Sequence, residues 1–367
     1  PALAGPWRGV LRPARPGGVT LGHAGVLVGP TGEVTLIDVG NDSHDDDLRD
    51  FLAELRANAP HVAPGIKHIL VTHYHADHGD GIEDLLERLP IDGAVIHRGI
   101  HGLSDAANDR TGGKICDAIE ASGARELALC TPGCAEPPGP SNCRLDEGEL
   151  LGAGGDETSF VALGDGARLT LIGADAQMAG ERYTEVVGPL LEEDGNGENA
   201  RSIVAVAEHG PFRMLLTGDL TGGGSDTDAV EAFFAPRLAQ VSDIGPAGVD
   251  VLQLGHHGRD TSSSQIWLDR VLPADGCPRH AIMGISSAHL RSPHQVVLDR
   301  VLDGRLSGGM GWTTLIALGG ANAPDLVNAD GGTLRIRTVD GGAGYLIEAA
   351  DDRGRRITAM GEHACGL

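Results

Sequence analysis

Four side chains that bind metal ions readily stand close together in one short segment. Residues 72–78 are Thr-His-Tyr-His-Ala-Asp-His and come directly after an apolar run. Residues two apart in an extended segment point to the same side, so His73 and His75 can reach one ion. The chain must then turn, which lets Asp77 and His78 face a second ion. Imidazole and carboxylate groups suit zinc and similar first-row ions, so this spacing predicts a metal site rather than a polar loop.

Two segments in the second half of the sequence supply matching ligands. One apolar run ends in Gly-Asp at Asp219, and a carboxylate at such a strand end can bridge two ions. Another run ends in Gly-His-His-Gly, residues 255–258. We expect His256 to bind the second ion, and His257 either to replace it as a ligand or to contact substrate. The expected metal ligands are therefore His73, His75, Asp77, His78, Asp219 and His256.

The elements that must position these residues alternate between strands and helices in both halves of the chain. We expect strands at 26–28, 34–37, 66–71, 94–96, 167–171, 202–207, 213–216, 249–254, 280–285, 334–338 and 345–348, and helices at 47–57, 82–89, 229–238, 266–272 and 295–302. This order predicts an α/β fold of two mixed sheets with helices outside. Residues 101–160 are weakly patterned and rich in Gly, Pro and Cys. We interpret them as an insertion in a single domain that spans residues 1–367.

The charge of the chain limits its partners. Acidic residues outnumber basic ones by 52 to 28, which gives a formal net charge of −24. Such a charge disfavours long-range attraction of polyanions and permits a small anionic ester or a short nucleic-acid strand as substrate. No apolar run reaches the ~18 residues that a membrane span needs, so we expect a soluble chain. The sequence indicates no protein partner.

The cysteines indicate the compartment. There are six, and three of them, Cys130, Cys134 and Cys143, fall in a Pro/Gly-rich segment that disulfides would order. An even number is typical of secreted, disulfide-bonded proteins. The chain begins with Pro1 rather than Met, as a processed chain does, so we expect a secreted or extracytoplasmic location. A structural zinc site using the Cys130 and Cys134 pair is the alternative.

The ligand pattern resembles that of the metallo-β-lactamase superfamily, whose HxHxDH motif is followed by distant Asp and His ligands. The resemblance covers about residues 19–350. It implies an αββα sandwich, a hydrolase activity and two divalent ions, zinc or alternatively manganese. Asp38, at the end of an expected strand, matches a family aspartate that supports the metal ligands from behind.

A finer resemblance points to one branch of this superfamily. Four motifs look like the metallo-β-lactamase domain of the DNA-uptake competence channel (the ComEC type): Asn199-Ala200-Arg201-Ser202-Ile203-Val204, Leu216-Thr217-Gly218-Asp219, His256-His257-Gly258 and Ser292-Pro293-His294. The choline-phosphate esterases of Gram-positive cell walls have a similar His-His-Gly motif. Members of this branch are thought to cleave phosphodiesters, so the resemblance implies a phosphodiesterase or nuclease.

The chain departs from the family pattern at several positions. Gln253 stands where the branch often has Lys, and Arg259 stands where it has Ser. The superfamily's third-motif His has no clear counterpart, because His97 and His101 come too early and His209 falls in an expected turn. The first ion is therefore expected to have few protein ligands and open positions for water or substrate.

The expected mechanism uses a hydroxide held between two ions that Asp219 bridges. Asp77 would orient this nucleophile, and Arg259, with His257 or His294, would stabilise charge on the phosphate oxygens. The alternative is a lactone, thioester or β-lactam hydrolase of the same fold, which would be expected to have the third-motif His. A metal-binding protein without activity is a further alternative, and the nearly complete ligand set disfavours it.

Overall fold

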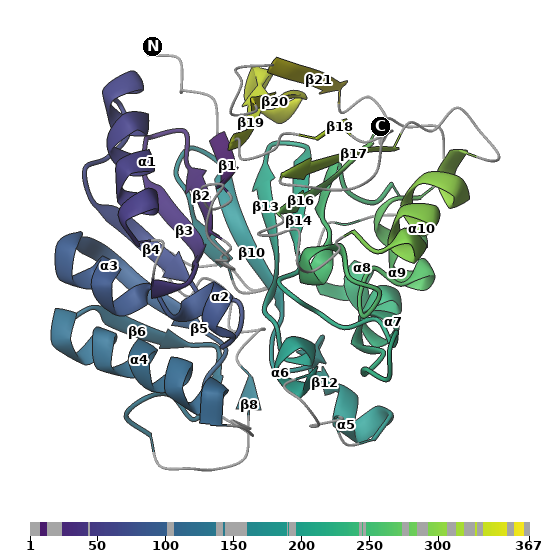
Figure 1. The fold of residues 1–367 in the computed structure, drawn as a ribbon, viewed down its shortest axis with the longest axis horizontal. Coiled ribbons are helices and arrows are strands. Elements are labelled where there is room, and N and C mark those ends of the chain that lie inside the picture. Colours follow the sequence, from purple (N-terminus) through teal and green to yellow (C-terminus); the bar gives the residue numbers. More distant parts are fainter. Residues whose placement is uncertain are drawn as a thin grey trace.

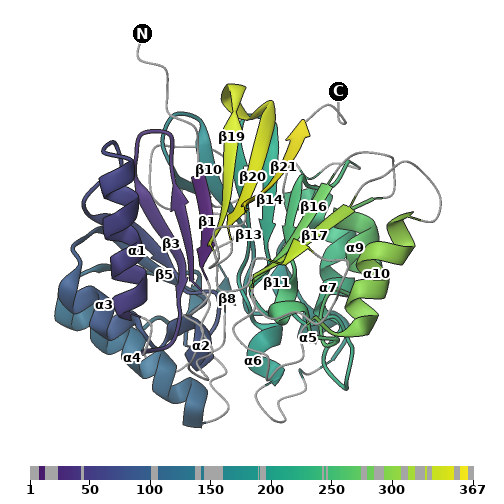
Figure 2. The same ribbon diagram turned by 45° about the horizontal axis from the view of Figure 1, so that its top comes forward.

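The computed structural model describes residues 8–12, 24–42, 45–100, 106–136, 142–143, 160–188, 190, 196–241, 244, 247–273, 279–284, 293–306, 313–318, 327–328, 333–350 and 356–362. Within these residues the chain forms two large sheets, with helices along their outer sides (Figures 1 and 2). Both sheets are mixed, since each combines parallel and antiparallel pairs.

The first sheet has nine described strands, in the order β21 (Arg356–Glu362), β20 (Gly344–Ala350), β19 (Thr333–Val339), β1 (Arg8–Arg12), β2 (Ala24–Val28), β3 (Val34–Val39), β4 (Ile66–Leu70), β5 (Ile91–His97) and β6 (Arg125–Ala128). Three helices flank it on the left of Figure 1: α1 (Asp45–Asn58), α3 (Ile82–Arg88) and α4 (Ala106–Ser122). The short helix α2 (Ala76–Gly79) follows β4.

The second sheet has eight described strands, in the order β18 (Val327–Asn328), β17 (Thr313–Leu318), β16 (Arg279–Gly284), β15 (Val251–Gln253), β14 (Phe212–Leu216), β13 (Val204–His209), β10 (Ala167–Gly173) and β9 (Phe160–Ala162). Its outer helices, on the right of Figure 1, are α7 (Val230–Phe234), α8 (Leu238–Val241), α9 (Gln265–Val271) and α10 (Gln295–Leu306). The short helix η3 (Ala235–Arg237) joins α7 to α8. The remaining elements are β7 (Cys130–Thr131), β8 (Asn142–Cys143), β11 (Gln177–Met178), β12 (Glu181–Arg182), α5 (Tyr183–Val186), α6 (Asn196–Ala200), η4 (Gly255–Gly258) and η6 (Asp340–Gly342).

Three groups of buried apolar side chains fill the three interfaces between these layers. On β3, Leu36 packs with the outer helices while Ile37 packs between the sheets. On β13, Val206 packs with the outer helices, and Ala207 packs between the sheets. Successive side chains of a strand point to opposite faces, so each sheet is buried on both sides. This arrangement confirms the αββα sandwich that the sequence predicted.

The strands bring one edge of each sheet together. β3, β4 and β5 run parallel in the first sheet, and β14, β15 and β16 run parallel in the second. The carboxyl ends of parallel strands lie at the same edge of a sheet. The two edges meet directly, because the backbone N–H of Ile203 donates to the carbonyl of Thr72 over 2.9 Å. Loops that follow β4, β14 and β15 therefore converge.

The segment interpreted as an insertion contains regular structure. Residues 106–122 form α4, and β6 adds an edge strand to the first sheet. Ile115, Ala118 and Ile119 give α4 a buried face. The adjacent Gly112 and Gly113, which disfavour a helix interior, hid this periodicity in the sequence. We propose that any insertion is confined to the residues after β6.

Two disulfides tie this region together. Cys116 of α4 bonds to Cys134, and Cys130 of β7 bonds to Cys143 of β8. The zinc alternative for Cys130 and Cys134 does not hold, because each sulfur is bonded to another cysteine. The other two cysteines of the sequence, Cys277 and Cys365, lie outside the described residues. The described residues therefore contain two disulfides, in agreement with the expectation that disulfides order this segment.

Peptide mapping without reduction is expected to recover both cross-linked peptide pairs. The Cys130→Ala/Cys143→Ala double variant should lose about 3 kcal/mol of stability, the value typical of a loop of roughly 15 residues, in denaturant unfolding of the metal-free protein. The Cys116→Ala/Cys134→Ala double variant is the matched comparison. Ellman titration of denatured, unreduced protein that counted these four thiols as free would contradict the assignment.

None of the helices in the described ranges combines the length and the apolar composition needed to cross a bilayer.

Candidate metal centre

The ligand segment begins where β4 ends, at the edge shared by the two sheets. The backbone N–H of Val71 still donates to Ile96 of β5 over 2.9 Å. The chain then leaves the sheet and turns into α2 at Ala76. This turn places His73 and His75 before the helix and Asp77 on its first turn. The sequence predicted the turn but not the helix.

The first group of candidate ligands is His73, His75 and Asp219. His73 Nε2 lies 3.1 Å from His75 Nδ1 and 3.7 Å from Asp219 Oδ2. These three ligand atoms are close enough to share one ion. His73 and Asp219 are buried, whereas His75 is partly exposed, so the group is reached from the His75 side.

The second group is Asp77, His78 and His257. His257 Nε2 lies 3.2 Å from Asp77 Oδ2, and His78 Nε2 lies 4.0 Å from the same oxygen. Sequence reasoning favoured His256 in this position and left His257 as the substitute. The structure places His257 there instead, and His256 lies beside Asp219 with its Nε2 3.8 Å from Oδ2.

Asp219 lies between the two groups. Its Oδ1 is 3.4 Å from His78 Nε2, and its Oδ2 is 3.7 Å from Nε2 of both His73 and His257. Gly218 precedes it with φ of +52°, a conformation that glycine adopts without strain. The Asp219 N–H donates to Ser202 Oγ over 3.1 Å, which fixes the turn. The carboxylate is therefore held where it can contact ions in both groups.

The donor set fits divalent cations. Ligands of a tetrahedral ion with bonds of ~2.0–2.1 Å lie roughly 3.3 Å apart, close to several of these distances. Burial would lower the pKa of His78, yet the charges of Asp219, Asp38 and Asp77 raise that pKa well above its ordinary value. Burial also opposes protonation of His257, and again the carboxylates raise its pKa. The site therefore attracts positive charge.

Asp38 fixes the orientation of the ligand rings from behind. Its Oδ2 is 2.7 Å from His78 Nδ1 and accepts from Thr72 Oγ1 over 2.8 Å, while its Oδ1 accepts the Thr72 N–H over 2.7 Å. Thr72 Oγ1 in turn lies 3.1 Å from His73 Nδ1. With Nδ1 of each ring engaged, His73 and His78 direct their Nε2 lone pairs into the cluster, as metal-bound histidines do.

Asp38→Ala is expected to weaken metal binding by ~10–100-fold, because two ligand rings lose their support. Competition with a chromophoric chelator measures this affinity. Asp84→Ala, which removes a carboxylate from α3, is the matched control and should bind metal as the wild type does. An unchanged affinity in Asp38→Ala would mean that the rings need no such support.

A buried ionic network supports the loop from the second half of the chain. Glu198 of α6 accepts the Tyr74 N–H and Arg98 Nε, both over 2.8 Å. Arg98 also faces Asp175, which pairs with Arg201 over 2.6 Å. Glu198 and Arg98 were missed in the sequence, because their pairing across 100 positions leaves no local signal.

Tyr74 packs rather than facing substrate. Its side chain is fully buried, and its hydroxyl donates to the Gly99 carbonyl over 3.0 Å and lies 2.6 Å from His97 Nδ1. Tyr74 therefore packs against the His97–Gly99 segment and stabilises the ligand loop. His97 lies behind the loop, His209 lies at the far end of β13, and His101 is outside the described residues.

The remaining predicted residues divide into two places. Arg259 Nη1 lies 3.4 Å from His256 Nε2, at the ligand cluster. His294 instead lies beside Asp260, with its Nδ1 3.1 Å from Oδ1 and in position to accept the Asp260 N–H. His294 contacts the loop that carries Arg259, and the structure does not bring it to the ligand groups.

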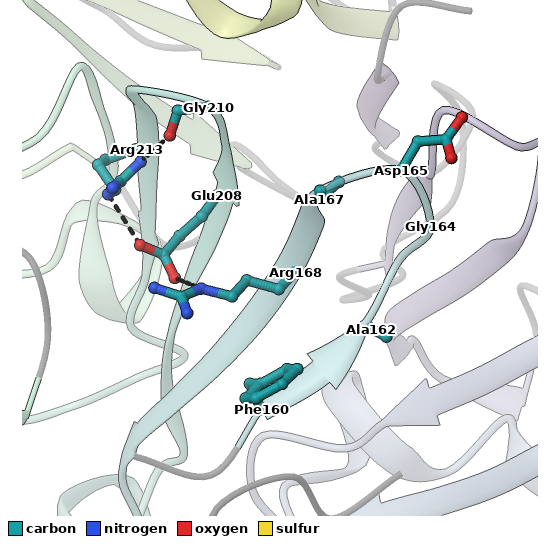
Figure 3. A pocket seen from close by; sticks show the side chains of 10 residues that line it. Phe160, Ala162, Gly164, Asp165, Ala167, Arg168, Glu208, Gly210 and Arg213 are labelled. Carbon is teal, nitrogen blue, oxygen red and sulfur yellow. Dashed lines mark hydrogen bonds and ion pairs between the residues drawn. The ribbon is translucent and has the colours of Figure 1, made fainter. Parts of the chain in front are cut away.

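A separate hollow of about 430 Å³ lies at the end of the second sheet that is far from the histidine–aspartate cluster. Figure 3 shows the side chains that line it. It is lined by Phe160, Arg168, Glu208 and Arg213, among others. Glu208 is engaged by both arginines, over 2.6 Å to Arg168 and 2.8 Å to Arg213. The lining of this hollow contains no histidine, so it offers no group comparable to the histidine–aspartate cluster.

Neither protein-family models nor curated protein sequences match the chain. Similar solved structures include a metallo-β-lactamase with a HARLDQ motif from Cronobacter sakazakii, at 17% identity over 65% of this chain and 75% of that chain, with a TM-score of 0.31. A Thermotoga maritima protein described as a metallo-β-lactamase has 12% identity over 64% and 93%, with a TM-score of 0.34. The flavodiiron protein from Giardia intestinalis has 10% identity over 82% and 76%, with a TM-score of 0.28.

At these low TM-scores the likenesses carry no weight in assigning the fold, which rests on the two sheets and the helices outside them. The fold and the cluster define the chain as an αββα sandwich with a histidine–aspartate cluster at the shared edge of its sheets.

Proposed function

We propose that the protein is a metal-dependent hydrolase that cleaves phosphodiesters. The position of Asp219 supports this most directly, because its carboxylate lies between two groups of imidazoles and carboxylates. Two divalent ions bound there would lower the pKa of a water molecule and polarise the bond to be cleaved. Zinc is the proposed ion, with manganese as the alternative, since both accept these ligands.

The proposed ligands follow the two groups. His73, His75 and Asp219 would hold one ion, and Asp77, His78, Asp219 and His257 would hold the other. Asp77 is partly exposed and its pKa is held low, against the effect of burial, by His78 and His257. It therefore stays ionised and can both bind its ion and accept a hydrogen bond from the attacking water.

We also propose that residues 1–367 form a single domain, as the sequence predicted.

Arg259 favours an anionic substrate over a neutral one. A guanidinium is always charged, and its planar donors match the oxygens of a phosphate. A neutral lactone or β-lactam offers no charge to offset that guanidinium. His294 is proposed to position the Arg259 loop through Asp260 rather than to touch substrate. The net charge of −24 favours a short substrate over a long duplex.

The experiment is a substrate panel with metal-loaded protein. Bis-p-nitrophenyl phosphate and a short single-stranded DNA are expected to be cleaved, and a homoserine lactone and nitrocefin are expected to be poor substrates. Chelator-treated protein is the control and should regain activity when zinc or manganese returns. Elemental analysis should find about two ions per chain. Rapid lactone or nitrocefin turnover with intact diesters would replace this proposal with its alternative.

The disulfides favour a location outside the cytoplasm, because such bonds persist in oxidising compartments. A secreted or extracytoplasmic enzyme would meet cell-wall phosphodiesters or short nucleic-acid fragments as substrates of this class. Fractionation of the source cells, with immunodetection of the protein in each fraction, tests the location.

A further inference from the structure

We propose that Asn199, His256 and Arg259 form an anion-binding corner beside the metal centre that holds a non-bridging phosphate oxygen of the substrate. This inference rests on the proposed phosphodiesterase function and names the residues that would recognise its substrate. It also gives His256, which belongs to neither ligand group, a role of its own.

The three side chains converge on one point. His256 Nε2 lies 3.5 Å from Asn199 Nδ2 and 3.4 Å from Arg259 Nη1. The same nitrogen lies 3.8 Å from Asp219 Oδ2, which places the corner against the metal centre. An oxygen bound at this point would therefore lie next to the bond that the ions polarise.

Two buried polar atoms of the corner have no hydrogen-bond partner among the residues that the structure describes. They are Asn199 Oδ1 and Arg259 Nε. Asn199 is only 2% exposed, so water reaches it poorly. A buried polar group without a partner is costly to keep. With the amide of Asn199 turned so that its oxygen faces a protonated His256 Nε2, the NH₂ group becomes the unpartnered donor that a ligand oxygen can engage.

The backbone holds the corner in a strained form. His256 and His257 have φ of +46° and +52°, a region that L-residues rarely adopt. His256 Nδ1 lies 2.5 Å from Thr261 Oγ1, which fixes the direction of its Nε2. Strain of this kind persists when the surroundings enforce it, and it is typical of functional sites. It lets two consecutive rings serve the same site in different ways.

Further contacts fix the loop that carries Arg259 and Thr261. Buried Glu231 of α7 accepts the N–H groups of Ser263 over 2.7 Å and Ser264 over 2.6 Å. Ser262 Oγ donates to the Gly255 carbonyl over 2.6 Å. The side chains of the corner are therefore held in place in the absence of a ligand. Such preorganisation is required of donors that stabilise developing charge.

The chemistry of the corner selects a tetrahedral oxyanion. The guanidinium only donates hydrogen bonds and carries a fixed positive charge. The amide of Asn199 adds a second donor, and His256 adds a third in the tautomer in which Nδ1 accepts from Thr261 Oγ1 and Nε2 carries the proton. A phosphodiester oxygen and free phosphate share the chemistry that these donors recognise. The first is the proposed substrate and the second serves as the probe.

The test is calorimetric titration of metal-loaded protein with inorganic phosphate. Asn199→Ala and Arg259→Gln are each expected to weaken phosphate binding by about tenfold or more, since each removes a hydrogen bond to a charged group. Elemental analysis should find the same metal content as in the wild type. Arg259→Lys should recover part of the affinity. Arg168→Gln removes the same charge at the far end of the sheet and should bind phosphate as the wild type does.

Three outcomes would overturn the corner: no phosphate binding by the wild type, unchanged binding in Arg259→Gln and Asn199→Ala, or loss of an ion from Asn199→Ala. If the variants weaken phosphate binding as expected but the wild type cleaves no diester, the corner stands and the proposed function fails. If the wild type cleaves diesters but both variants bind phosphate as tightly as the wild type, only the proposal of the anion-binding corner is wrong.

Discussion

Asp219→Ala is expected to abolish diester cleavage and to lower the metal content of the protein. The carboxylate faces His78 on one side and His73 on the other, so its loss removes a ligand from both groups. Two ions deprived of the anion between them would also repel each other. Metal stabilisation of the reaction is worth several kcal/mol, so the rate should fall on the order of 10³-fold or more.

Steady-state rates with bis-p-nitrophenyl phosphate and elemental analysis after gel filtration measure the two effects. Asp219→Asn keeps the shape of the side chain without its charge and should lose most of the activity as well. Asp226→Asn, an exposed position seven residues further on, is the matched control and should behave as the wild type. Near-normal turnover by Asp219→Ala would remove the bridging carboxylate from the mechanism.

The paired histidines should respond differently to the same substitution. His257→Ala is expected to lower the metal content towards one ion per chain, because His257 lies with Asp77 and His78. His256→Ala should keep both ions and lose activity by ~10–100-fold, the loss typical of a residue that acts beside the ligands. Metal content thus separates the two roles where activity alone would not.

Each variant is the other's control, since both remove an imidazole from the same turn. Circular dichroism would confirm that the sheets are intact in both. Loss of an ion from His256→Ala, with full metal content in His257→Ala, would restore the assignment that the sequence favoured.

The sequence predicted the parts of the site that depend on local order. The spacing of His73, His75 and Asp77 after an apolar strand was enough to predict their common location, and Asp219 followed from the same strand-end logic. The rule that parallel strands end at one edge then brings the loops together. The αββα architecture was also predictable from local patterns, since apolar runs alternate with helical patterns in both halves of the chain.

Which of His256 and His257 lies with Asp77 and His78 was not predictable, because it depends on two left-handed backbone conformations. Propensity gives no sign of such strain in a non-glycine pair, since tertiary contacts with Thr261 and Ser262 enforce it. Asn199 was visible as part of a motif, but its unpartnered oxygen was not. Contacts between distant segments decide these features, and a local pattern does not encode them.

Each ligand group draws on both halves of the chain. His73 and His75 leave the first sheet and meet Asp219 of the second, and Asp77 and His78 meet His257 in the same way. Bound ions would therefore act as removable cross-links between the layers, and part of their binding free energy would become folding free energy. Neither half alone could hold them tightly. The resistance of the protein to heat and proteases would then track the free metal concentration around it, which ties its lifetime to the supply of metal.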